Sequence, residues 1–126
     1  MIRDISIVIP IYNEQDNIIQ LIKEVRASLE KKINYEIIIV DDGSDDNTYE
    51  VVNKINKINK NINIISHKKN YGQSIGLRTG IIEANSEYIV TLDGDGQNDP
   101  RDILKLIKPF DSKVSFMMLQ NNRVAL

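Results

Sequence analysis

The sequence predicts an α/β protein built on a doubly wound, mostly parallel β-sheet. Four short apolar runs, at 6–10, 35–40, 61–66 and 88–92, are typical of buried strands, and segments with helical periodicity separate them. Acidic residues directly follow the second and the fourth run. Because a helix between two strands favours a parallel crossover, we expect the carboxyl ends of these strands to meet at one edge of the sheet.

The first half of the chain alternates strands and helices. The first strand, 6–10, ends in a proline. A helix is expected from about 15 to 31, because apolar residues recur there at spacings of three and four. The second strand, 35–40, leads through a polar turn into a helix at 48–58, and the third strand follows at 61–66.

The second half begins with a helix that is unusually rich in glycine. Glycines recur every fourth residue, at Gly72, Gly76 and Gly80. A glycine inside a helix costs about 1 kcal/mol relative to alanine, so this stripe indicates close approach, either to the sheet or to a ligand. The fourth strand is expected at 88–92, and Pro100 starts a helix that ends near Phe110.

Length and composition limit the classes of protein. With 126 residues, the chain holds one domain or part of one. Its 41% hydrophobic and 27% charged residues are typical of globular proteins, and its net charge of −2 gives no support for a nucleic-acid partner. The absence of cysteine excludes disulfides and thiolate zinc sites and fits a reducing compartment. No apolar run approaches the ~18–20 residues of a membrane span.

The most informative stretch follows the fourth strand and reads Asp93-Gly-Asp95-Gly-Gln97-Asn-Asp99-Pro100. Its carboxylates and carboxamide, with no Cys or His nearby, form an all-oxygen ligand set that suits Mg²⁺ or Mn²⁺ rather than zinc. Magnesium commonly shares its coordination shell with substrate phosphates. The stretch therefore indicates a metal-bridged diphosphate site, and the alternative is a solvated turn rich in turn-forming residues.

Further candidates follow the first and the second strand. Tyr12 can stack on a base, and Glu14, Asp41 or Asp42 can accept hydrogen bonds from a base or a ribose. The alternatives are that Tyr12 is a half-buried packing residue and that the two aspartates only cap a turn.

The segment after the third strand is polar and basic. Lys68, Lys69 and Arg78 can meet a phosphate or can simply be solvated, and His67 is interpreted as a strand-end residue without a role. One histidine and no cysteine cannot form a Ser-His-acid or Cys-His constellation. The sequence also lacks a P-loop and the glycine fingerprint of a dinucleotide site.

Four ordered motifs carry a family resemblance. They are Ile9-Pro-Ile-Tyr-Asn-Glu14, Val40-Asp-Asp-Gly-Ser-Asp-Asp-Asn-Thr48, Lys69-Asn-Tyr-Gly72 and Asp93-Gly-Asp-Gly-Gln-Asn-Asp-Pro100. With them the sequence resembles family-2 glycosyltransferases of the GT-A fold over about residues 5–110. It is most similar to the branch, including the dolichol-phosphate mannosyltransferase type, that transfers a sugar from a nucleotide diphosphate to a polyprenyl phosphate.

The resemblance implies roles for the matching positions. The implied nucleotide-sugar-binding residues are Pro10, Tyr12, Glu14, Val40, Asp41, Asp42, Asp93, Gly94 and Arg123. The implied ligands of a Mg²⁺ or Mn²⁺ ion are Asp93, Asp95 and Gln97. Such an ion would act as a Lewis acid and neutralise charge on the departing nucleoside diphosphate.

Members of this family continue well beyond the position of Leu126. Their additional residues bind the lipid-phosphate or glycan acceptor and often supply the catalytic base and a membrane anchor. We therefore expect residues 1–126 to be the nucleotide-sugar-binding half of a catalytic domain, truncated on its C-terminal side. This half is expected to lie in the cytoplasm, to reach a membrane only through other segments, and to transfer sugar poorly by itself.

Three alternatives are considered. The chain could be a non-catalytic, nucleotide-binding remnant of such an enzyme. It could also be a receiver-like Mg²⁺-binding domain, in which 37–42 is the first strand and Asp93 the phosphate acceptor, but residues 1–35 would then be surplus. A haloacid-dehalogenase phosphatase uses a similar Asp-x-Asp pair, but on its first strand.

Overall fold

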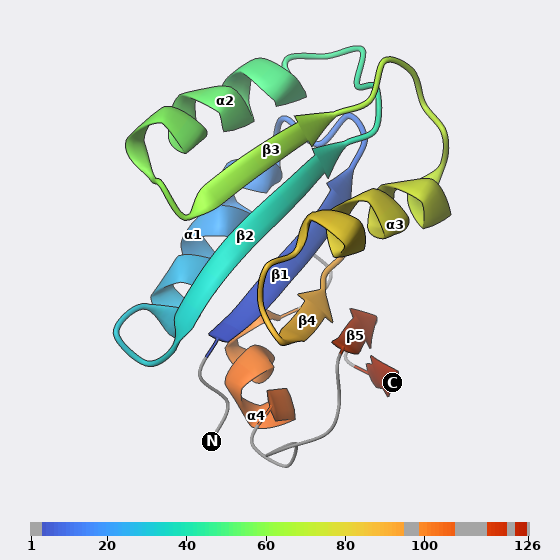
Figure 1. Cartoon of the computed structure of the whole chain (residues 1–126). Coiled ribbons are helices and arrows are strands. Elements are labelled where there is room, and N and C mark those ends of the chain that lie inside the picture. The colour runs from blue at the N-terminus through green and yellow to red at the C-terminus, as the bar shows by residue number, and fades with distance from the viewer. Residues whose placement is uncertain (1–3, 95–98, 108–115, 121–122, 126) are drawn as a thin grey trace.

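The computed structural model describes residues 4–94, 99–107, 116–120 and 123–125, and from residue 106 onward it describes the backbone without side chains (Figure 1). The strands are β1 Asp4–Ile11, β2 Asn34–Asp41, β3 Ile62–Ser66, β4 Tyr88–Thr91, β5 Phe116–Gln120 and β6 Arg123–Ala125. The helices are α1 Ile18–Leu29, α2 Thr48–Ile58, α3 Gln73–Glu83 and α4 Ile103–Ile107, with a 3-10 turn, η1, at Pro100–Asp102.

The strands form one sheet in the order β3-β2-β1-β4-β5-β6. β1 lies between β2 and β4 and runs parallel to both, so that Val8 lies opposite Ile38 on one side and Thr91 on the other. β2 and β3 are also parallel, as are β4 and β5, whereas β6 is antiparallel to β5. The predicted doubly wound, mostly parallel α/β sheet is therefore confirmed, and β5 and β6 are additions that the sequence did not predict.

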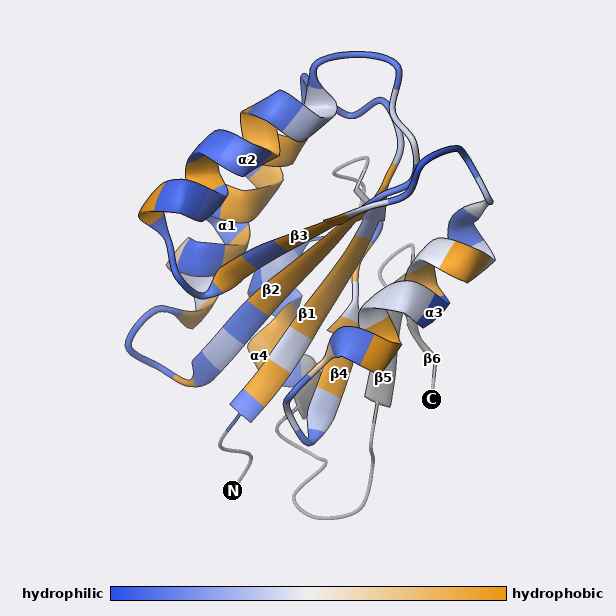
Figure 2. Cartoon of the chain, turned by 45° about the horizontal axis from the view of Figure 1, so that its top comes forward, coloured by the Kyte–Doolittle hydropathy of each residue, from blue (hydrophilic) through white to orange (hydrophobic). Residues whose placement is uncertain are grey.

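Helices cover both faces of this sheet. Figure 1 shows α1 and α2 on one face and α3 on the other. Alternate side chains of β1 pack on opposite faces of the sheet. Ile7 and Ile9 belong to the core beneath α1 and α2, and Val8 belongs to a smaller core beneath α3. Because both faces are buried there, β1 from Ile5 onward and β2 from Ile37 onward consist mostly of buried apolar residues, and these parts of the two arrows are largely orange in Figure 2.

Most element boundaries agree with the sequence-based prediction, and α2 has the predicted bounds. α1 begins three residues later than expected because residues 15–17 form a turn, in which the carbonyl of Glu14 accepts from the amides of Asn17 and Ile18. The chain leaves this helix before Lys31, whose φ of 63° is not helical. The last helix is described as far as Ile107, and the rest of its predicted span lies outside the described residues.

The glycine stripe of α3 lets this helix pack closely on the sheet. A Cβ atom on Gly80 would lie 2.3 Å from Cγ1 of Val8, and a Cβ atom on Gly76 would lie 3.2 Å from Cβ of Pro10. Gly72 differs, because it precedes the helix with a φ of 102° and no atom lies within 4 Å of where its Cβ would be. At Gly76 and Gly80, helix-to-sheet packing therefore explains the stripe.

The position of β1 excludes the receiver-like alternative. β1 pairs with β2 from Asp4 to Ile11, and it occupies a central place in the sheet. The residues before β2 are therefore part of the fold and are not surplus. Among the residues described, no helix has the length and apolar character needed to cross a membrane.

Replacing Gly80 with alanine tests the close packing of α3. The new methyl group would collide with Val8, and overpacking of this kind destabilises the folded protein by about 1–3 kcal/mol. The higher helix propensity of alanine offsets about 1 kcal/mol of this loss. We expect urea unfolding to show a net loss of stability. Ser74→Ala, at an exposed position of the same helix, should change stability by less than about 0.5 kcal/mol. Equal stability of the two variants would contradict the packing account.

Candidate functional site

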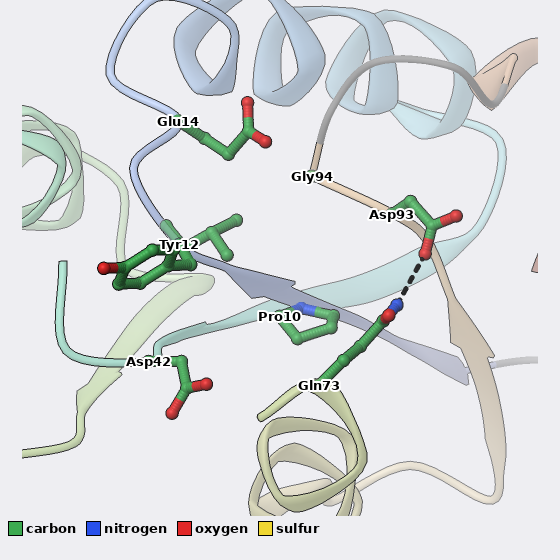
Figure 3. Close-up of a pocket in the computed structure, with 8 residues that line it drawn as sticks. Pro10, Tyr12, Glu14, Asp42, Gln73, Asp93 and Gly94 are labelled. Atoms are coloured by element: carbon green, nitrogen blue, oxygen red, sulfur yellow. Dashed lines mark hydrogen bonds between the residues drawn. The ribbon is translucent and has the colours of Figure 1, made fainter. Parts of the chain in front are cut away.

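A cavity of about 250 Å³ opens at the carboxyl edge of the sheet (Figure 3). The loops after β1, β2 and β4 and the first residue of α3 surround it. Its lining residues are Pro10, Ile11, Tyr12, Glu14, Asp42, Gln73, Asp93 and Gly94. The structure thus brings together most of the residues that the sequence proposed for nucleotide-sugar binding, and adds Ile11 and Gln73.

Asp42 is a buried carboxylate of the cavity with three hydrogen-bond partners. It is 3% exposed, yet its Oδ1 accepts from the backbone amide of Tyr71 at 2.9 Å, and its Oδ2 accepts from that of Gly72 at 2.8 Å. Nδ1 of His67 lies 2.9 Å from the same Oδ1. Burial raises the pKa of Asp42, but these hydrogen bonds outweigh the effect of burial and hold its pKa below the ordinary value.

The backbone after β2 is shaped to receive these donors. Gly43 has a φ of 73°, and a Cβ atom on it would lie 2.4 Å from the carbonyl carbon of Lys69. Only a residue without a side chain permits this approach. The contact brings the segment before α3 against the end of β2, where the amides of Tyr71 and Gly72 can reach Asp42.

Asp41, the other acid of the pair, is buried but does not line the cavity. Successive residues of a strand point to opposite faces, and Oδ1 of Asp41 accepts from the amide and the hydroxyl of Ser44 at 3.1 and 2.5 Å. It therefore stabilises the turn after β2, as the turn-capping alternative stated. Val40 is also buried and packs beneath α3.

The loop after β1 is fastened to the loop after β2. Asn13 adopts a φ of 51°, which asparagine tolerates better than most residues. Its amide donates to Oγ of Ser44 at 2.9 Å, and its Oδ1 accepts from the amide of Asp45 at 2.8 Å. These bonds fix the backbone directly after Tyr12.

Tyr12 presents a partly free aromatic ring at the cavity. The residue is 41% exposed, and its hydroxyl donates to Oδ2 of Asp45 at 3.0 Å. That hydrogen bond, together with the charge of Asp45, raises the pKa of Tyr12 above its ordinary value. A ring that is held at its hydroxyl end and exposed on its face is suited to stacking.

Glu14 follows on the same loop. Its amide donates to Oγ1 of Thr48 at 2.9 Å, and its Oε2 accepts from Nδ2 of Asn17 at 2.9 Å. Thr48 is fully buried, and both its amide and its hydroxyl donate to Oδ1 of Asp46. Glu14 is thus positioned by the starts of two helices, with its side chain directed into the cavity (Figure 3).

Asp93 and Gly94 close the opposite side of the cavity. Nε2 of Gln73, at the start of α3, donates to Oδ1 of Asp93 at 2.9 Å (Figure 3). A Cβ atom on Gly94 would lie 2.4 Å from Cγ2 of Ile11, so only glycine lets the end of β4 lie directly against the end of β1.

Several predicted site residues cannot be placed in this cavity. Asp95 and Gln97 lie outside the described residues, and Arg123 lies in β6, where only the backbone is described. Their roles therefore stay predictions. Lys68, Lys69 and Arg78 are exposed and do not line the cavity.

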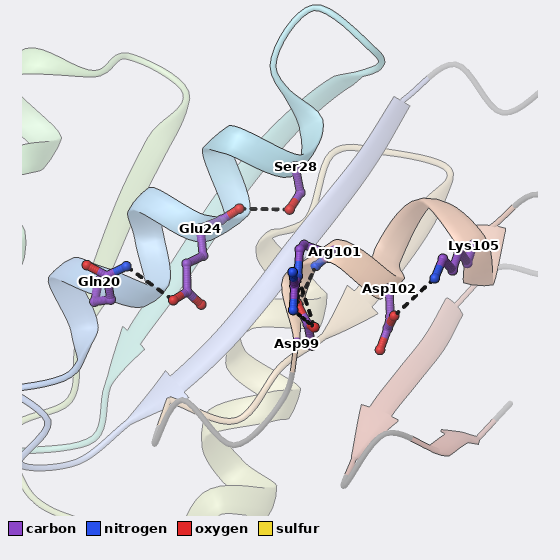
Figure 4. A network of polar contacts seen from close by, with 7 residues as sticks. All are labelled: Gln20, Glu24, Ser28, Asp99, Arg101, Asp102 and Lys105. Carbon is purple, nitrogen blue, oxygen red and sulfur yellow. Dashed lines mark hydrogen bonds and ion pairs between the residues drawn. The ribbon is translucent and has the colours of Figure 1, made fainter.

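Asp99, the last acid of the motif, has a structural role. Its side chain caps η1 by accepting from the amide of Arg101 at 3.0 Å, and it pairs with Nη2 of the same arginine at 2.8 Å (Figure 4). This guanidinium holds the pKa of Asp99 below its ordinary value. The network fixes the backbone where the chain enters α4, beside α1.

Two residues that organise the cavity were missed from the sequence. Gln73 carried no signal beyond its place at a helix start. His67 was given no role, but its two ring nitrogens lie 2.9 Å from Asp42 and 2.9 Å from Oγ1 of Thr79. These partners are 25 and 12 residues away in sequence, so the contacts could be found only from the fold.

Residues 6–123 match the domain family described as glycosyl transferase family 2, and the chain belongs to this family. It is similar to the undecaprenyl-phosphate 4-deoxy-4-formamido-L-arabinose transferase of Proteus mirabilis (35% identical over 108 residues) and to that of Yersinia enterocolitica (39%). Each match covers 84% of this chain and 33% of the relative. The chain therefore spans about a third of the length of these curated relatives.

Solved structures show the same fold. The crystal structure of S. aureus TarS 1–349 in complex with UDP-GlcNAc is 26% identical, with a TM-score of 0.71 over 85% of this chain and 30% of that one. The mannosyltransferase PcManGT of Pyrobaculum calidifontis, in complex with GDP-Man and Mn²⁺, is 24% identical, with a TM-score of 0.70 over 82% of this chain and 30% of that one. The predicted GT-A fold is thereby confirmed.

The hydrogen bonds of Asp42 predict how stability depends on pH. Because its pKa is lower in the folded chain than the ordinary 3.8, the stabilisation is fully present above that value and is lost as the pH falls through the folded value. Urea unfolding from pH 6 down to pH 2.5 should therefore show a smaller decline for Asp42→Asn than for the unaltered chain. Identical declines in the free energy of unfolding would contradict the assignment of a lowered pKa to Asp42.

Proposed function

We propose that this chain is the nucleotide-sugar-binding part of a metal-assisted glycosyltransferase that acts on a polyprenyl phosphate or a related lipid-linked acceptor. One observation carries the proposal. A single cavity collects an aromatic ring after β1, a desolvated carboxylate after β2, and an aspartate with its glycine after β4. Family membership makes sugar transfer the chemistry for which such a cavity is used.

The two sides of the cavity suit the two parts of a nucleoside diphosphate. On one side, the ring of Tyr12 can stack on a base, and Asp42 can accept from a base N–H group. Glu14 can accept from a ribose hydroxyl. On the other side, Asp93 and Gly94 line the part of the cavity that we propose for the diphosphate.

A divalent ion fits the chemistry of the Asp93 side. The proposed ligands are Asp93, Asp95 and Gln97, and the one that the structure describes, Asp93, presents a carboxylate to the cavity. Within the described part of the chain, no three His, Cys, Asp or Glu residues form a metal cluster. PcManGT was solved with GDP-Man and Mn²⁺, so a protein of this fold can bind a nucleotide sugar together with such an ion. Bound Mg²⁺ or Mn²⁺ would supply Lewis acidity toward the leaving diphosphate.

The acceptor is proposed from the names of the relatives. The names of both transferases contain undecaprenyl phosphate, which supports an acceptor of this kind. We propose that the reaction takes place at the cytoplasmic face of a membrane. The described residues support binding of the donor. We assign them no catalytic base.

Donor binding is tested by calorimetry with UDP, GDP and ADP in the presence of Mn²⁺. We expect one nucleotide to bind and Asp42→Asn to weaken it about 10- to 100-fold, because a hydrogen bond to a charged group is worth about 1.5–3 kcal/mol. Asp102→Asn is the matched control, because it alters a partly exposed carboxylate that lies 4.0 Å from Nζ of Lys105 and outside the cavity. This variant should bind the nucleotide as tightly as the unaltered chain. Failure of all three nucleotides to bind would overturn the proposal.

Metal assistance is tested separately by comparing Asp93→Asn with the unaltered chain, with and without Mn²⁺. We expect Mn²⁺ to strengthen nucleotide binding by the unaltered chain and to do so less for the variant, because Asp93 would help to hold the ion. An equal effect of Mn²⁺ on both would remove Asp93 from the metal site. Turnover in a parallel transfer assay with undecaprenyl phosphate would exclude the alternative of a remnant that only binds.

A further inference from the structure

We infer that His67 determines the base preference of the proposed nucleotide site. His67 fills one acceptor position of Asp42, and the site should therefore bind uracil more tightly than guanine. The pairing edge of uracil has a single N–H donor, whereas that of guanine has two adjacent donors. The inference rests on the proposed function, because it concerns the same cavity. Its new content is the role of His67 and of Thr79, which holds it.

The hydrogen bonds of Asp42 leave little room for a ligand. An ionised carboxylate has about four acceptor positions. On Oδ1, the amide of Tyr71 and Nδ1 of His67 are both 2.9 Å away, so both positions of this oxygen are filled. On Oδ2, the amide of Gly72 at 2.8 Å fills one. Among the described residues, these contacts leave one acceptor position, on Oδ2.

The orientation of His67 is fixed at both ends of its ring. Asp42 can only accept when ionised, so Nδ1 of His67 carries the hydrogen that lies between them. Nε2 lies 2.9 Å from Oγ1 of Thr79 on α3, and the side chain is only 12% exposed. The ring of Tyr71 stands edge-on to it, with the ring centroids 5.4 Å apart. His67 therefore cannot turn away from Asp42 without giving up its contact with Thr79.

The chemistry of the bases then gives the preference. The pairing edge of uracil presents one N–H group between two carbonyl oxygens, so a single free position on Asp42 satisfies its donor. The corresponding edge of guanine presents a ring N–H and an amino group side by side, which a carboxylate binds through both oxygens. With Oδ1 filled, one guanine donor would be buried without a hydrogen-bond partner. Because an unpaired buried donor costs free energy, guanine should bind more weakly than uracil.

Paired measurements of UDP and GDP affinity test this inference, with Mn²⁺ held constant. We expect the unaltered chain to bind UDP at least about tenfold more tightly than GDP. His67→Leu removes the donor to Oδ1 and should narrow this ratio about tenfold, chiefly through tighter binding of GDP. His67→Asn keeps an N–H donor near the position of Nδ1 and should preserve most of the ratio.

Thr79→Val tests the second contact of the ring. The substitution removes the hydroxyl that contacts Nε2 of His67 and changes the shape of the side chain little. The ratio of the affinities for UDP and GDP should therefore narrow, but less than in His67→Leu. Ser28→Ala is the matched control, because it also removes a hydroxyl from a helix, here one that donates to the carbonyl of Glu24 on α1. It should leave the ratio unchanged. If His67→Leu does not fold, the comparison of His67→Asn with Thr79→Val decides.

The possible outcomes separate this inference from the proposed function. If the unaltered chain binds neither nucleotide, the proposed function fails, and the inference fails with it. If it binds GDP as tightly as UDP, the site is a nucleotide site but the inference about His67 is overturned. An equal loss of affinity for both nucleotides in His67→Leu would also overturn it, because a purely structural role predicts loss without a change in preference.

Discussion

The parallel pairing of β1 with both β2 and β4 is the constraint on which the rest of the structure depends. It places the carboxyl ends of three strands at one edge, and backbone hydrogen bonds continue this alignment past the strands. The amide of Asp42 donates to the carbonyl of Ile11 at 2.8 Å, and the amide of Leu92 donates to that of Val8 at 3.0 Å. Buried aliphatic residues on both faces keep this register, because a shift by one residue would exchange the two faces.

The site uses this alignment to stabilise a buried charge. Asp42 directly follows β2, in which residues 37–40 are apolar and buried, and three donors compensate the loss of water around its carboxylate. All three come from the segment that enters α3. Gly43, Gly76 and Gly80 let this segment and its helix approach the sheet. Close packing of backbone on backbone and the electrostatics of the cavity are therefore parts of one arrangement.

The sequence predicted β1 to β4 and the helices between them, because each of these strands is an apolar run and the helices have apolar periodicity or flanking turn residues. It also predicted that acids after β2 and β4 would share an edge. It did not predict β5 and β6. It could not choose between Asp41 and Asp42, since that choice depends on which face α3 covers. His67 and Gln73 were missed for the same reason, because their partners come from other elements and no local pattern marks them.

The most direct test of the account is a map of amide chemical-shift changes as UDP and Mg²⁺ are added to the ¹⁵N-labelled chain. The account predicts that the changes concentrate at the amides of Tyr12, Asp42 and Gly94. At the opposite edge of the sheet, Glu36 accepts from the hydroxyl of Ser6 at 2.5 Å, and the amides there should not respond. Changes centred on that opposite edge, or an unchanged spectrum, would contradict the claim that these three loops form a nucleotide-sugar site.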